Sequence, residues 1–210
     1  MINIFIADDH ELIRGTLIRV LLEEPDMKVV GEAKNAMEVL EKMRKTECDI
    51  IVLDLNMPGR SGLDMIVDLK ILNPQLRILI LSIYPEEKYA IRALRAGANG
   101  YISKDVALQE LVTAIRKIYT RGKYLSASLA EQLAFDICTD KVPLPHEHLS
   151  NREFEIMCMI ASNMKVNEIA AGLLLSINTV NTYRTRIFEK MNVKSNVELT
   201  HYALNAKLVD

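Results

Sequence analysis

Five short apolar runs, each followed by apolar residues at helical spacing, constrain the fold of this chain more than any other feature. The runs lie at residues 2–7, 27–33, 50–54, 76–81 and 99–103. Parallel strands are joined by right-handed crossovers, usually through a helix, and the loops between these units are short. The sequence therefore predicts an α/β fold: a five-stranded, doubly wound parallel sheet with helices on both faces.

After Gly122 the alternation stops. Residues 123–146 hold an amphipathic segment at 126–138 followed by Pro143 and Pro145, so we interpret them as a partly helical linker. From residue 147 onward the periodicity is only helical, in three or four short segments. We predict a first domain over residues 1–122 and a small all-α domain over residues 147–210.

Two local signals mark helix ends in the second domain. Ser150 followed by Glu153 is the pattern of a capping box, which starts a helix. Asn163 tolerates the left-handed conformation that commonly ends one. Together they predict a helix from about residue 150 to about residue 163.

Composition limits the kinds of partner. The formal net charge of the 210 residues is −2, which excludes a strong overall attraction to nucleic acid or anionic membrane, so any such binding must depend on local basic groups. The first apolar run meets Asp8 and Asp9 too early for a signal peptide or a membrane span. Three widely spaced cysteines suit reduced thiols. We expect a cytoplasmic protein without membrane contact.

Polar side chains follow the predicted strands at the points where these end. Asp8 and Asp9 follow the first strand, Asp54 ends the third, and Ser82 and Lys104 follow the fourth and fifth. Ligands of open parallel sheets gather at this edge. Carboxylates that converge there would repel one another unless a divalent cation such as Mg²⁺ lay among them. Such an ion could orient a phosphoryl group for transfer to a carboxylate, with Lys104 and Ser82 binding the phosphoryl oxygens.

Each of these residues also has an ordinary explanation. Asp9 can cap the following helix and complement its dipole. Asp54 can be a loop acid, Ser82 a turn residue and Lys104 a surface lysine. Their common position at one edge of the sheet favours a site.

Residues 1 to about 120 resemble the receiver domain of two-component response regulators, which has a flavodoxin-like fold. The matching positions are Asp8, Asp9, Asp54, Met57, Pro58, Gly62, Ser82, residues 97–101 and Lys104. The resemblance implies that Asp54 accepts phosphate from a sensor histidine kinase. It also implies that Asp9, Asp54 and the Asn56 carbonyl hold Mg²⁺ with support from Asp8.

The same resemblance assigns a relay. Ser82 and Tyr101 would transmit the change, the hydroxyl moving toward the phosphoryl group and the ring turning inward. The chain departs from many receivers at Asp105, where they carry proline.

The second domain has the size of a helix-turn-helix whose second helix covers residues 176–191. On a helical wheel, Ile177, Val180, Ile187 and Met191 share one side. Candidate DNA contacts are Asn178, Asn181, Thr182, Arg184, Thr185, Arg186, Lys190 and Lys194. Asn pairs with adenine, Thr contacts base edges or the thymine methyl, and Arg and Lys bind phosphate or guanine. Residues 147–210 nevertheless hold seven basic and seven acidic side chains, so a bundle that docks another protein explains the periodicity equally well.

Residues 149–153, 167–170, 175–176, 179–180 and 190–191 resemble the LuxR-type helix-turn-helix of the NarL/FixJ response regulators. Residues 180–184 and 197–201 are most similar to the UvrY/GacA branch, and Asn163 stands where relatives usually carry glycine. This resemblance implies a phosphorylation-switched transcription factor that binds double-stranded DNA, as a homodimer when phosphorylated, and is not a metabolic enzyme.

Two alternatives stay open. A helical tail of this kind could dock protein or RNA. The sequence Asp54-Leu55-Asn56 after a strand also resembles aspartate-nucleophile phosphatases of the haloacid dehalogenase type, but Asn56 stands where those enzymes carry a second acid.

Overall fold

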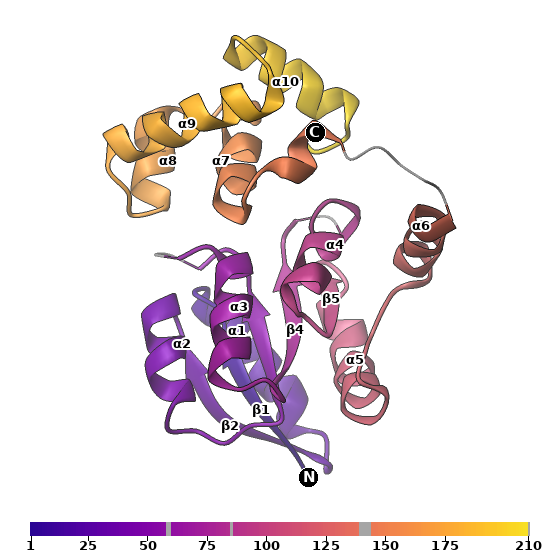
Figure 1. Cartoon of the computed structure of the whole chain (residues 1–210). Helices are drawn as coiled ribbons and strands as arrows, with labels where there is room; N and C mark the ends of the chain where they lie inside the picture. The colour runs from indigo at the N-terminus through magenta and orange to yellow at the C-terminus, as the bar shows by residue number, and fades with distance from the viewer. Residues whose placement is uncertain (58–59, 85, 139–143, 210) are drawn as a thin grey trace. The chain divides into compact units, whose positions relative to one another are not determined.

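The computed structural model describes residues 1–57, 60–84, 86–138 and 144–209. The chain divides into two compact units, Met1–Cys138 and Thr139–Asp210 (Figure 1). The predicted turn residues Pro58 and Gly59, and residues 139–143 of the predicted linker, lie outside the described residues. Within the described ranges, no helix is both long and apolar enough to span a membrane.

The first unit confirms the predicted parallel sheet. Its strands are β1 (Ile2–Ala7), β2 (Met27–Ala33), β3 (Ile50–Asp54), β4 (Arg77–Ser82) and β5 (Gly100–Ser103). They lie in the order β2-β1-β3-β4-β5, and every neighbouring pair is parallel. β3 is therefore the central strand. All five of its residues are buried, as expected where helices cover both faces of a parallel sheet.

Helices surround this sheet. They are α1 (Glu11–Leu22), α2 (Ala36–Met43), α3 (Gly62–Leu72), α4 (Glu86–Ala96), α5 (Ala107–Arg121) and α6 (Ala127–Cys138). α1 packs against α5, while α3 contacts α2 and α4. The α1 and α5 side of the core includes Leu17, Leu21, Leu111, Ile115 and Ile118, which are at most 1% exposed. This packing holds the carboxyl ends of the strands, and the acids on them, in fixed positions.

The predicted helix after residue 126 is present as α6 and belongs to the first unit. The Ser126 hydroxyl accepts a hydrogen bond from the backbone N–H of Leu129 (3.1 Å) and so caps α6. The same hydroxyl donates to Glu86 Oε2 at the start of α4 (2.6 Å). One side chain therefore joins the start of the predicted linker helix to α4. The boundaries of the linker stay a prediction.

The second unit is helical throughout the part that is described. Its elements are a 3₁₀ turn at Pro145–His148, then α7 (Asn151–Ala161), α8 (Val166–Gly172), α9 (Ile177–Met191) and α10 (Asn196–Asn205). The predicted capping box is confirmed: Glu153 N–H donates to Ser150 Oγ (3.3 Å), and Ser150 N–H donates to Glu153 Oε2 (2.7 Å). Asn163 has a φ of 63°, which confirms the left-handed residue after α7.

Candidate functional site

A buried lysine joins two of the predicted acids at the carboxyl edge of the sheet. Lys104, directly after β5, places its Nζ 2.8 Å from Asp54 Oδ2 and 2.7 Å from Asp8 Oδ2. Asp54 is 0% and Asp8 1% exposed, and the Lys104 side chain is 7% exposed. The chain brings these groups together because β1, β3 and β5 end at the same edge. The peptide bond between Lys104 and Asp105 is trans.

Asp9 and His10 complete the cluster on its solvent side. The Asp9 side chain is 29% exposed, and its Oδ1 lies 2.8 Å from His10 Nδ1. The backbone N–H of His10 donates to Asp8 Oδ1 (2.8 Å). One potential ligand atom each from Asp8, Asp9, His10 and Asp54 lies within 4.8 Å of all the others. His10 was not among the predicted site residues, although its position directly after the two acids was an available signal.

Burial and the neighbouring charges shift the pKa values of Asp54 and Lys104 in opposite directions. Burial raises the pKa of Asp54 above its ordinary value, although the bonds from Lys104 and from the Asn56 backbone N–H (3.0 Å) oppose the rise. Burial alone would lower the pKa of Lys104, but its bonds to Asp54 and Asp8 raise it overall. Asp8 and Asp54 thus share Lys104, and Asp9 lies beside them. This excess of negative charge and the hard oxygen donors fit a divalent cation.

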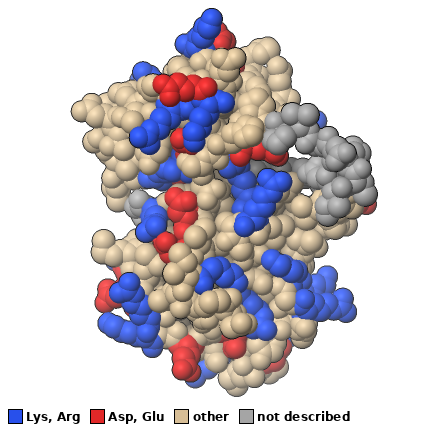
Figure 2. Space-filling view, in the orientation of Figure 1, with Lys and Arg blue, Asp and Glu red and all other residues tan. Residues whose placement is uncertain are grey.

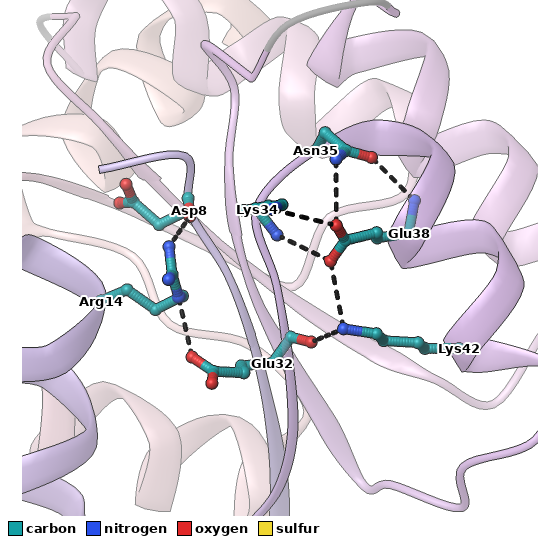
Figure 3. Close-up of polar contacts among 7 residues, drawn as sticks. All are labelled: Asp8, Arg14, Glu32, Lys34, Asn35, Glu38 and Lys42. Carbon is teal, nitrogen blue, oxygen red and sulfur yellow. Dashed lines mark hydrogen bonds and ion pairs between the residues drawn. The ribbon is translucent and has the colours of Figure 1, made fainter. Parts of the chain in front are cut away.

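Residues on α1, β2 and α2 fix the segment that carries Asp8 (Figure 3). Arg14 Nη1 donates to the backbone oxygen of Asp8 (2.8 Å), and its Nε donates to Glu32 Oε2 (2.8 Å). Lys42 Nζ donates to the backbone oxygen of Glu32 (2.9 Å) and to Glu38 Oε2 (3.1 Å). The guanidinium of Arg14 therefore lies between the end of β1 and the neighbouring β2, and it positions Asp8 from the backbone side.

The two predicted relay residues meet at Tyr84 in the loop after β4. Ser82 is 0% exposed, and its Oγ accepts a hydrogen bond from Tyr84 N–H (3.1 Å). Tyr101 is 1% exposed, and its hydroxyl donates to the backbone oxygen of Tyr84 (2.8 Å). Burial raises the pKa of Tyr101. The backbone N–H of Lys104 also donates to the Ser82 carbonyl oxygen (2.7 Å), so this loop is connected to the acidic cluster through β4 and β5. Sequence reasoning missed Tyr84, because its contribution is made by backbone atoms.

The predicted polar face of α9 is accessible in the second unit. Of the four apolar residues that share one side of the predicted helix, Val180, Ile187 and Met191 are buried, but Ile177 is 52% exposed. Ile177 is the first residue of the helix, one turn before the buried Val180. The candidate contacts Asn178, Thr182, Thr185, Arg186, Lys190 and Lys194 are exposed, and Asn181 and Arg184 are partly buried.

Two of the candidate DNA contacts have local hydrogen bonds. The hydroxyls of Thr182 and Thr185 donate to the carbonyl oxygens of Asn178 (2.9 Å) and Asn181 (3.2 Å). Their methyl groups and hydroxyl lone pairs remain available to a ligand. Lys190 differs from the other basic residues because its Nζ lies 2.6 Å from Glu153 Oε2.

Charge is mixed on the face of the molecule that Figure 2 displays. Figure 2 shows Asp and Glu side chains among the Lys and Arg side chains on the face that it displays. This distribution agrees with the net charge of −2.

Two family models match the chain. Residues 4–116 match the response regulator receiver domain, and residues 147–203 match bacterial regulatory proteins of the luxR family. The chain is 40% identical over 205 residues to the response regulator UvrY of Escherichia coli K12, covering 97% of the chain and 94% of UvrY. It is 38% identical over 210 residues to the response regulator GacA of Pseudomonas protegens, covering 100% of the chain and 99% of GacA.

A solved structure supports the same assignment. The RcsB response regulator of Salmonella typhimurium, in a structure titled for its conformational dynamism for DNA interaction, is 25% identical and superposes with a TM-score of 0.69. The match covers 96% of each chain. The resemblances found from the sequence, including the similarity to UvrY and GacA, are therefore confirmed.

Proposed function

Because the chain belongs to the response regulators that join a receiver domain to a LuxR-type DNA-binding domain, we propose that phosphorylation of Asp54 controls its binding to DNA. The observation that carries this proposal is the bridge from Lys104 to Asp54 and Asp8, with Asp9 beside it. We further propose a receiver over residues 1–122, a linker over 123–146 and a DNA-binding domain over 147–210.

Asp54 is the proposed acceptor in the transfer from a sensor histidine kinase. A carboxylate oxygen of Asp54 forms a bond to phosphorus while the bond from phosphorus to the kinase's histidine nitrogen breaks. Lys104 lies 2.8 Å from Asp54 Oδ2 and can neutralise the phosphoryl oxygens as they arrive. The chain thereby takes part in its own phosphorylation and hydrolysis without being a metabolic enzyme.

The proposed metal ion is Mg²⁺, held by Asp9, Asp54 and the carbonyl of Asn56, with Asp8 in support. When bound, it would offset the charge of the phosphoryl oxygens and orient them for in-line transfer. The support is the excess of carboxylates over lysine in the cluster and the short distances among their oxygens. His10 holds Asp9 from the solvent side through the 2.8 Å contact of its Nδ1.

Ser82 and Tyr101 are the proposed relay. An acyl phosphate at Asp54 adds roughly one negative charge near pH 7 and new acceptor oxygens. Ser82 Oγ can turn from Tyr84 N–H toward those oxygens, which would free the loop that Tyr101 also holds. The loop leads into α4, so the change reaches the surface of the receiver.

The proposed readers of DNA lie on α9 and, for Lys194, shortly after its C-terminal end. Asn178, Asn181, Thr182 and Thr185 would contact base edges, while Arg184, Arg186 and Lys194 would contact phosphates. Two phosphorylated chains would bind half-sites about one turn of DNA apart as a homodimer. We also propose a cytoplasmic location, because the chain would have to reach both the DNA and the sensor histidine kinase there.

The test is incubation of the full chain with acetyl phosphate and Mg²⁺, followed by intact mass and DNA footprinting. We expect wild type to gain one phosphoryl group and to protect DNA more strongly, and Asp54→Ala to do neither. Protection of DNA by Asp54→Ala that still increases with acetyl phosphate would refute the proposal. If wild type is phosphorylated but protects no DNA and instead binds protein or RNA, only the proposed function of the receiver would be supported.

A further inference from the structure

A buried carboxylate connects the two helices that form most of the DNA-binding unit. Glu153, in the first turn of α7, is 4% exposed. Its Oε2 accepts hydrogen bonds from Lys190 Nζ (2.6 Å) and from Ser150 N–H (2.7 Å). Lys190 lies in the last turn of α9, 37 residues further along the chain. A single oxygen atom therefore caps α7 and holds the end of α9.

Both charges are placed favourably with respect to the helix dipoles. Glu153 lies at the positive N-terminal end of α7, and Lys190 lies at the negative C-terminal end of α9. Burial alone would raise the pKa of Glu153, but its bonds to Lys190 and Ser150 lower it overall. Glu153 Oε2 thus has two hydrogen-bond partners, and loss of either bond would leave a buried charge with fewer partners.

Lys190 is not equivalent to the other basic residues of this region. The Lys190 side chain is 42% exposed, but its ammonium group is directed to Glu153. Arg186 and Lys194 are exposed, and neither side chain has an ion pair among the residues that are described. If the Lys190 ammonium moved to a DNA phosphate, it would leave Glu153 buried without its cation. Arg186 and Lys194 could move to a phosphate without such a cost.

We propose that Lys190 is a positioning residue that fixes α9 against α7 through Glu153 and does not contact DNA phosphate. The orientation of α9 sets how Asn181, Thr182 and Thr185 approach the base edges. Lys190 therefore affects the affinity for every DNA sequence, because it sets the orientation of α9 within the unit. This inference rests on the proposed DNA binding of α9.

The salt dependence of DNA affinity distinguishes a lysine that only positions α9 from one that contacts a DNA phosphate. Each phosphate contact contributes about one to the slope of log affinity against log salt. We would measure this slope for phosphorylated full-length wild type, Lys190→Met and Lys194→Met on a protected fragment. Lys194→Met should reduce the magnitude of this slope by about one, because one phosphate contact is lost. Lys190→Met should bind more weakly at every salt concentration with an unchanged slope, and Lys190→Arg should recover most of the affinity.

Thermal unfolding of the same full chains gives a test that needs no DNA. Lys190→Met and Glu153→Gln should each lower the melting temperature of the DNA-binding unit, by roughly 4 to 8 °C, and the double variant should fall by much less than the sum. Glu153→Gln keeps an oxygen that can accept from Ser150 N–H, so it controls for loss of the helix cap. Lys194→Met should melt as wild type.

Failure of the positioning role and failure of the proposed DNA binding give different results. If Lys190→Met reduces the magnitude of the slope by about one and leaves the melting temperature unchanged, Lys190 is a phosphate contact and not a positioning residue. Additive losses in the double variant would overturn the positioning role as well. A wild type that binds no DNA at any salt concentration would instead contradict the proposed function, while the double-variant melting temperatures would still decide whether Lys190 and Glu153 are coupled.

Discussion

The two units of the chain each contain a buried carboxylate bound to a lysine, and the two pairs differ in what surrounds them. Lys104 Nζ lies 2.8 Å from Asp54, and Lys190 Nζ lies 2.6 Å from Glu153. Lys104 also binds Asp8, with Asp9 close by, and the pKa of Asp54 is raised by burial. Within the described part of the chain, Glu153 shares its lysine with no other acid, and its pKa is lowered.

The same type of ion pair can therefore support a reaction in one unit and stabilise the fold of the other. In the receiver, one cation faces several acids, so the cluster can bind further positive charge and then a phosphoryl group. In the DNA-binding unit, one cation faces one acid that is also bonded to Ser150, so its charge is already satisfied. We therefore expect substitutions of the first pair to change reactivity and substitutions of the second to change stability.

The largest effect is expected from Asp54→Asn. This variant lacks the carboxylate oxygen that forms the bond to phosphorus, so intact mass after incubation with acetyl phosphate and Mg²⁺ should show no added phosphoryl group. Glu153→Gln is the matched control, because it removes the other buried carboxylate and should be phosphorylated as wild type. A phosphoryl group found on Asp54→Asn would place the acceptor elsewhere and remove the proposed distinction between the pairs.

A large loss of stability is expected from Lys104→Met. Asp8 and Asp54 would remain buried without their cation, and breaking a buried pair costs about 3 kcal/mol or more. Lys190→Met should cost about 1 kcal/mol, because the Lys190 side chain is 42% exposed. Urea unfolding at neutral pH in the presence of a chelator measures both. Adding Asp54→Asn to Lys104→Met should recover part of the loss; if it does not, the buried charge is not its cause.

The receiver site was largely predictable because its residues occupy defined positions in a repeating pattern. A parallel sheet places every strand's carboxyl end at one edge, so the positions of Asp8, Asp54 and Lys104 followed from the alternation alone. The roles of the groups came from the resemblance. The contact of Ser82 and Tyr101 with the backbone of Tyr84 was not predictable, because backbone hydrogen bonds in a loop leave no periodic signal.

The DNA-binding unit was predictable in its helices but not in the use of its charges. The capping pattern of Ser150 and Glu153 is local in sequence and was confirmed. The pairing of Lys190 with Glu153 spans 37 residues and depends on how α7 and α9 cross, which periodicity does not determine. The positive charge of Lys190, close in sequence to Arg184, Arg186 and Lys194, therefore grouped it with the candidate DNA contacts. A helical wheel could not show that Ile177, at the start of α9, is exposed.

Magnesium should stabilise one unit and not the other. At ten times its dissociation constant, an ion that binds only the folded receiver adds about 1.4 kcal/mol to its free energy of unfolding. Calorimetry of the full chain should show this increase in the receiver transition only. Asp9→Asn and Asp54→Asn should each reduce it, since both remove a proposed ligand. An equal increase in Asp9→Asn and wild type would exclude Asp9 as a ligand.

The smallest expected effect is an opposite response of the two carboxylates to acid. The folded pKa of Glu153 is lowered, so its contribution to stability is present above the ordinary value of 4.5 and is lost as the pH falls through the folded value. The folded pKa of Asp54 is raised, so its contribution is present below the ordinary value of 3.8 and is lost as the pH rises through the folded value. Urea unfolding of wild type, Glu153→Gln and Asp54→Asn between pH 7 and the acid range measures both. As the pH falls, the difference in free energy of unfolding between wild type and Glu153→Gln should shrink. Over the same range, the free energy of unfolding of wild type should rise relative to that of Asp54→Asn. Parallel responses would mean that the two carboxylates have similar surroundings, and the comparison between the pairs would fail.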